Sequence, residues 1–183
     1  SGVYACESSL QAGEQLFGTA SRIDAWVLIE YPGTWGRKAF EESEIPEPVK
    51  RHVADSLSGT PNASVKLIRQ PARREEQGLA CFVARSDETD PRLYRFQLDS
   101  YDGLLALDLA ALLTGDAAYQ DALTEEKLML VCTNGRRDLC CARYGVVAYD
   151  ALAEPGGDAV WQSSHLGGHR QNQNRSQLPP TPV

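Results

Sequence analysis

The sequence lacks both a long apolar run and an excess of positive charge. Its longest apolar run, Leu104 to Leu113, is interrupted by Asp108 and is far shorter than the ~20 residues that span a bilayer, so no membrane-spanning segment is expected. Its 18 Lys and Arg stand against 25 Asp and Glu, which gives a formal net charge of −7. Non-specific nucleic-acid binding requires a basic surface, so this class of function is not expected either.

A secretory signal and an even set of cysteines are also missing. No basic segment followed by an apolar one stands at the N-terminus, so export is not expected. The five cysteines are an odd number at uneven spacing, whereas a secreted disulfide scaffold is normally shorter and has paired cysteines. These features predict a cytoplasmic protein whose thiols are free or bound to metal.

Segments typical of strands and helices alternate along the chain. Strands are expected over residues 25–31, 64–69, 79–84, 92–98 and 126–131, and helices over residues 48–59 and 104–113. This alternation predicts the α/β class with a mixed sheet. We expect an N-terminal lobe over residues 1–125, a ligand-bearing segment over 126–170, and an extended, polar and proline-rich tail over 171–183.

Two residues with reactive side chains are expected to be structural. Cys81 lies among apolar residues of the strand expected at 79–84 and is predicted to be a core thiol. His52 is expected on the solvated face of the helix at 48–59.

A turn rich in cysteine follows the last expected strand. Cys132 stands at the end of that strand, where α/β folds place their chemistry. Asn134-Gly135 predicts a turn, and Asp138 can cap the next helix, which places Cys140 and Cys141 in its first turn. Free N–H groups there favour the thiolate form. One of these two cysteines can then face Cys132.

Histidine is scarce, yet two of the three histidines, His165 and His169, lie close together in Ser164-His165-Leu166-Gly167-Gly168-His169. The paired glycines predict a tight loop rather than a helix. Two thiolates and two imidazoles suffice for a four-coordinate metal site. Zinc accepts this set tetrahedrally, and a two-iron cluster accepts it with cysteines on one iron and histidines on the other, as in Rieske centres.

Residues 131–141 and 164–170, together with 18–20 and 30–36 at the front of the chain, closely resemble the sucrase/ferredoxin-like family of thioredoxin-like ferredoxins. The resemblance runs from about Cys6 to Arg170. It implies a thioredoxin-like ferredoxin fold and a [2Fe-2S] cluster outside the Rieske fold.

Carried over residue by residue, the family pattern assigns the cluster ligands. The two cysteines correspond to Cys132 and Cys141 and the two histidines to His165 and His169, with Cys140 as a packed bystander. Family members usually continue with Phe-Ala and an apolar strand, whereas this sequence is polar from residue 171 onward. We therefore expect a truncated C-terminal part and an open pocket around the cluster.

Three functions remain open on these residues. The first is electron transfer through a [2Fe-2S] cluster to a redox partner protein, without conversion of a substrate. The second is a structural zinc module with the same four ligands. The third is a thiol–disulfide oxidoreductase that uses Cys132 or the Cys140-Cys141 pair. Arg136 and Arg137 could steer an acidic redox partner.

Overall fold

The computed structural model describes residues 23–73, 78–86, 89–115 and 117–167. Its strands are β1 (Ala25–Glu30), β2 (Ala63–Arg69), β3 (Leu79–Arg85), β4 (Arg92–Leu98), β5 (Met129–Cys132) and β6 (Val160–Ser163). Its α-helices are α2 (Glu47–Ser58), α3 (Leu109–Thr114) and α4 (Val146–Gly156). Shorter helical turns are η2 (Tyr101–Ala106), η3 (Ala117–Ala122), η4 (Cys141–Gly145) and η5 (Gly157–Ala159). The predicted α/β class is confirmed.

One six-stranded mixed sheet, in the order β4-β3-β1-β2-β6-β5, connects these elements. β1 and β2 are parallel and are joined through α2, while β3 and β4 form an antiparallel pair beside β1. β6 runs antiparallel to β2 and parallel to β5. The C-terminal ends of β5 and β6 therefore lie at the same edge of the sheet. The finer thioredoxin-like assignment stays a prediction.

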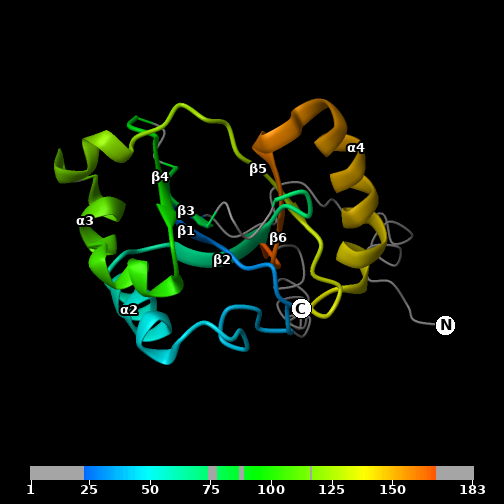
Figure 1. Cartoon of the computed structure of the whole chain (residues 1–183), viewed down its shortest axis with the longest axis horizontal. Coiled ribbons are helices and arrows are strands. Elements are labelled where there is room, and N and C mark those ends of the chain that lie inside the picture. Colours follow the sequence, from blue (N-terminus) through cyan, green and yellow to red (C-terminus); the bar gives the residue numbers. More distant parts are fainter. Residues whose placement is uncertain (1–22, 74–77, 87–88, 116, 168–183) are drawn as a thin grey trace, which may run out of the picture.

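Both faces of the sheet bury apolar side chains. Because successive side chains of a strand point to opposite faces, Val27 and Ile29 of β1 join a core that includes residues of α2 and α3, whereas Leu28 joins a second core with Phe82 and Trp161. The rings of Phe82 and Trp161 pack edge to face, with their centroids 5.6 Å apart. Figure 1 shows α2 and α3 at one end of the molecule and α4 beside β5 and β6 at the other.

Two sequence predictions about the elements were incomplete. The helix expected over residues 104–113 is divided into η2 and α3, because Asp108 accepts a hydrogen bond from the N–H of Ala111 and begins a new helix. β6 was not predicted, since it has only four residues and two of them, Gln162 and Ser163, are polar. The predicted tail, residues 171–183, lies outside the described residues. Within those residues no helix has the length and apolar character needed to cross a membrane.

His52 and Cys81 differ in how they match expectation. Cys81 is fully buried in the core, as predicted. The prediction that His52 lies on a solvated face is wrong, because its imidazole is partly buried and its Nε2 lies 2.9 Å from the carbonyl oxygen of Leu107. His52 thus links α2 to the segment between η2 and α3.

The helical segment that begins near Cys141 approaches β5 so closely that only glycine fits at residue 145. A Cβ atom on Gly145 would lie 1.9 Å from the carbonyl oxygen of Cys132. On the turn that follows β5, a Cβ atom on Gly135 would lie 2.5 Å from Cβ of Ala142. These close approaches hold the two cysteine-bearing segments against each other.

The packing at Gly145 can be tested by adding one methyl group. Gly145→Ala forces the helix away from β5, and we expect it to lower the free energy of unfolding by about 1–3 kcal/mol, measured by urea titration. Gly59→Ala is the matched control, since among the described residues no atom beyond the adjacent chain lies within 4 Å of the added Cβ, and Gly59 has a helical φ of −84°. Equal stability of the two variants would contradict the close packing.

Candidate metal centre

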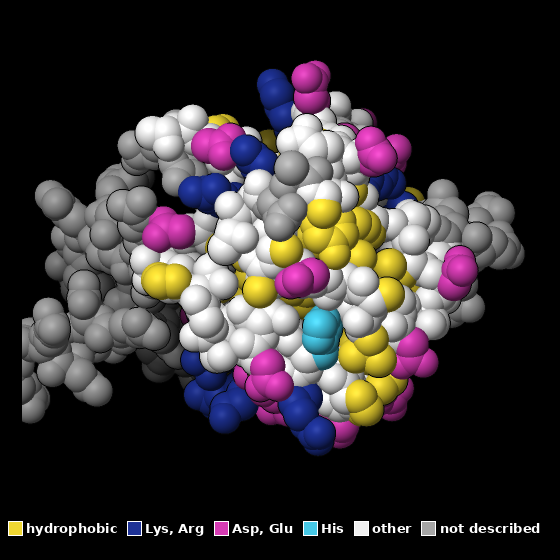
Figure 2. Space-filling view, turned by 90° about the vertical axis from the view of Figure 1, so that its left-hand side faces the viewer, with side chains coloured by type: hydrophobic (Ala, Val, Ile, Leu, Met, Phe, Trp, Pro, Cys, Tyr) yellow, Lys and Arg dark blue, Asp and Glu magenta, His cyan; other side chains and the backbone are white. Residues whose placement is uncertain are grey.

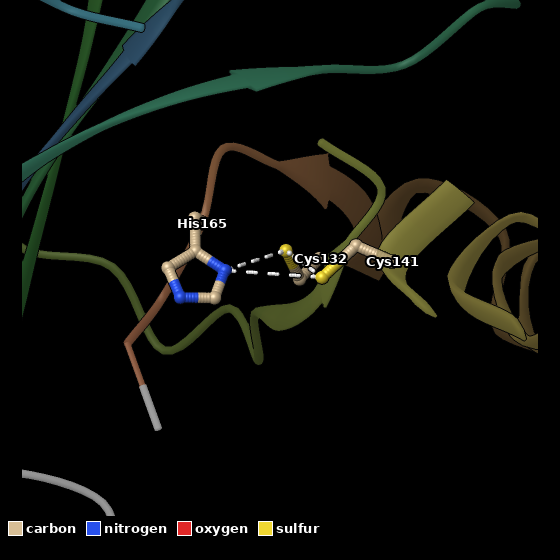
Figure 3. A group of neighbouring side chains, drawn as sticks. All are labelled: Cys132, Cys141 and His165. Carbon is tan, nitrogen blue, oxygen red and sulfur yellow. Dashed lines mark hydrogen bonds between the residues drawn. The ribbon is translucent and has the colours of Figure 1, made fainter. Parts of the chain in front are cut away.

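Three of the four predicted ligands converge. Cys132 comes from the end of β5, Cys141 from the start of η4, and His165 from the loop after β6. The two Sγ atoms lie 3.0 Å apart, and each lies 3.8 Å from Nδ1 of His165 (Figure 3). All three side chains are half-buried. His169 lies outside the described residues.

Hydrogen bonds between strands fix Cys132 and His165 relative to each other. In the parallel pairing of β5 with β6, Cys132 stands opposite Ser163. The next residue, Ser164, donates its N–H to the carbonyl of Leu67 at 2.8 Å, and its Oγ accepts the N–H of Leu67 at 3.0 Å. His165 is the next residue, so these hydrogen bonds to the β2 backbone determine the position from which its imidazole extends.

Cys141 is held by the helix start that the sequence predicted. The side-chain carboxylate of Asp138 accepts a hydrogen bond from the N–H of Cys140 at 3.0 Å. The backbone carbonyl oxygen of Asp138 accepts one from the N–H of Cys141, also at 3.0 Å. Asn134, on the preceding turn, donates its side-chain amide to the carbonyl of Gly36 at 3.0 Å. Of the two adjacent cysteines, Cys141 is therefore the one that faces Cys132.

Cys140 has a different chemical state from its neighbour. It is disulfide-bonded, so the expectation that every thiol is free or metal-bound is wrong at this position. Cys141 is not disulfide-bonded, which means that Cys140 and Cys141 do not form the adjacent redox couple considered from the sequence. Cys132 and Cys141 remain as the thiol pair.

The surroundings of Cys132 favour its thiolate. A hydrogen bond from Cys141 is the largest effect, and with smaller contributions from His165 and the backbone N–H of Asn134 it outweighs desolvation and lowers the pKa of Cys132 to about 5. Cys81 shows the opposite case, since desolvation by burial raises its pKa to about 12. At neutral pH Cys132 is thus a ready metal ligand, and Cys81 is an inert thiol.

The spacing of the three ligand atoms can be compared with the needs of a metal. Around one tetrahedral zinc ion, with Zn–S near 2.3 Å and Zn–N near 2.1 Å, two sulfurs lie about 3.8 Å apart and sulfur and nitrogen about 3.6 Å apart. The sulfur–nitrogen separations of 3.8 Å fit this requirement, and the sulfurs at 3.0 Å must separate by less than 1 Å. A two-iron cluster with imidazoles on the second iron needs the imidazole farther from the sulfurs. The donor types suit either group.

Sequence reasoning missed the residues that support the ligands. Ser164 ties the histidine loop to β2, and Asn134 ties the cysteine turn to Gly36. Only their positions were visible in the sequence: Ser164 directly precedes His165, and Asn134 belongs to the Asn134-Gly135 turn motif, which predicts a turn whether or not the asparagine binds another segment. Neither position indicates which distant segment it binds.

The thiolate of Cys132 can be detected in metal-free protein. Its folded-state pKa is lowered from an unfolded value of about 8.5, so its contribution to stability is present above that value and is lost as the pH falls through about 5. We expect alkylation of Cys132 by iodoacetamide, followed by peptide mass spectrometry, to show a midpoint at about pH 5. Cys141→Ala should raise this midpoint, and Cys141→Ser, which keeps a donor, should raise it less. A midpoint near the unfolded value would contradict the hydrogen-bonded thiolate.

Comparison with known proteins agrees with the resemblance seen in the motifs. The profile of the sucrase/ferredoxin-like family matches residues 16–180, which include both the cysteine turn and the histidine loop. No curated protein and no solved structure is significantly similar to the chain. Because the match covers most of the sequence, the chain belongs to the sucrase/ferredoxin-like family.

Proposed function

We propose that Cys132, Cys141, His165 and His169 hold a [2Fe-2S] cluster and that the protein transfers single electrons to and from a redox partner protein. The convergence of two thiols and one imidazole from three separate segments carries this proposal. Membership of a family named for ferredoxins supports it. When bound, the cluster supplies a one-electron redox couple.

The protein's own residues would tune that couple in two ways. Imidazoles are neutral where thiolates are charged, so two histidine ligands make reduction easier and favour a potential of about −150 to +300 mV, as in Rieske centres. The backbone N–H of Asn134 reaches the sulfur of Cys132, and hydrogen bonds to ligand sulfurs are a further means by which proteins set the potential.

Access for a redox partner is supported by the exposure of the site. The three ligands are half-buried, and the neighbouring Gly167 is exposed, as are Arg136 and Arg137 on the cysteine turn. Electrons can then reach the centre without a large rearrangement of the core. The two arginines would attract an acidic partner, which is the interaction expected from the sequence.

Spectroscopy with metal analysis tests the proposal directly. Anaerobically purified protein should absorb visible light and contain iron and acid-labile sulfide in equal amounts. His165→Cys should retain the colour and shift the potential downward, since a thiolate replaces a neutral ligand. His52→Gln is the matched control, because His52 hydrogen-bonds Leu107 away from the site and its loss should leave spectrum and potential unchanged. Colourless protein would contradict the cluster.

A structural zinc site is the second candidate. The sulfur–nitrogen separations of 3.8 Å, which fit ligands of a single ion, favour it. Under this alternative the purified protein contains stoichiometric zinc, and a chelator lowers its melting temperature without any change in visible absorption. Zinc-free, coloured protein would exclude it.

A further inference from the structure

A cavity of about 510 Å³ lies next to the candidate metal centre, and His165 forms part of its wall. Five segments of the described chain line it: residues 37–41, Leu57 of α2, the first residues of β2, the turn that includes Asn134, and the loop from Ser164 to Gly167. The volume is within the range of about 300–1,000 Å³ that is typical of small-molecule sites.

The charged side chains around this cavity are mostly basic. Among the described residues, Arg37, Lys38, Lys66 and Arg137 line it, against a single carboxylate, that of Glu41. Among the described residues none of the four basic side chains forms an ion pair. Like charges that surround a hollow repel one another, and bound negative charge relieves that repulsion.

This concentration of positive charge is unusual for the molecule. The chain as a whole carries a formal net charge of −7. On the face that carries α2 and α3, acidic side chains are interspersed with basic ones (Figure 2). The basic cavity is therefore a local feature and not a sample of the general surface.

Lys66 distinguishes the cavity from a merely basic surface. It lies on β2 and is half-buried. Desolvation is the main cause that lowers its pKa, and the charge of Arg137 lowers it further, while Cys132 and Glu41 act in the opposite direction. Because Lys66 forms no ion pair with another described residue, its desolvated ammonium group gains more from a bound anion than a solvated lysine does.

We infer that this cavity binds a small molecule bearing a carboxylate or phosphate group, held by Lys66 and Arg137 beside His165. A recessed lysine favours a small ligand over a protein surface, which would meet the exposed Arg37 and Lys38 first. The site goes beyond the proposed function, because its charges are the same whether the neighbouring centre holds iron or zinc.

Isothermal titration calorimetry of the metal-loaded protein, with inorganic phosphate and with citrate in moderate salt, tests the site. We expect saturable binding of at least one of these anions. Arg137→Gln and Lys66→Gln should each weaken it about tenfold or more, because each removes a charged hydrogen-bond donor. Circular dichroism melting confirms that the variants are folded, and Arg37→Gln at the rim offers a further variant should Lys66→Gln unfold.

Arg136→Gln is the matched control. Arg136 neighbours Arg137 on the same turn and carries the same charge, but it does not line the cavity. Its replacement should change the affinity by less than about twofold. Absence of saturable binding, or equal losses for the two arginine variants, would overturn the inference. Binding of an acidic peptide without binding of either small anion would overturn it as well and would identify the surface as a protein-docking site.

Discussion

The candidate centre depends on the position of β6 between β2 and β5. In the part of the chain that the structure describes, β5 joins the rest of the sheet through this short strand. Its antiparallel pairing with β2 continues into the two hydrogen bonds between Ser164 and Leu67, and its parallel pairing with β5 sets Cys132 opposite Ser163. The thiol and the imidazole are thus placed by strand pairing and by the two hydrogen bonds of Ser164 to the backbone of Leu67. Such bonds leave less freedom than contacts between flexible side chains.

The electrostatics of this edge differ from those of the molecule. Partners that donate hydrogen bonds stabilise a thiolate at Cys132, and basic side chains surround the adjacent hollow. Both features favour negative charge, although the chain is acidic overall. The core contains the reverse case in Cys81, where desolvation of the buried sulfur raises the pKa and keeps the thiol protonated. Burial alone therefore does not determine the state of a thiol here; the donors within reach of the sulfur do.

The sequence predicted much of the fold because most elements have clear local signals. Short segments typical of strands marked β1 to β4, and Asp138 marked the helix start that presents Cys141. Local signals failed where tertiary pairing decides the outcome. β6 exists because β2 and β5 lie on either side of it, and the partial burial of His52 depends on a carbonyl 55 residues away. The histidine motif was visible in the sequence, but the hydrogen bonds that position it, and the basic hollow, come from segments far apart in the chain.

η4 is a π-helical turn, which is wider than a turn of α-helix. Its width affects the direction in which the side chains of the following helix, α4, point. Cys141 starts this turn, and Tyr149 is a buried residue of α4 eight positions later. At 3.6 residues per turn, two side chains eight positions apart would point about 80° away from each other. In the wider π-helical turn each residue rotates the chain by a smaller angle, which removes most of that offset of about 80°. The side chains of Cys141 and Tyr149 can therefore both point toward the sheet. Insertion or deletion of a single residue between them would force one of the two to turn away, which makes the length of this segment as constrained as its sequence.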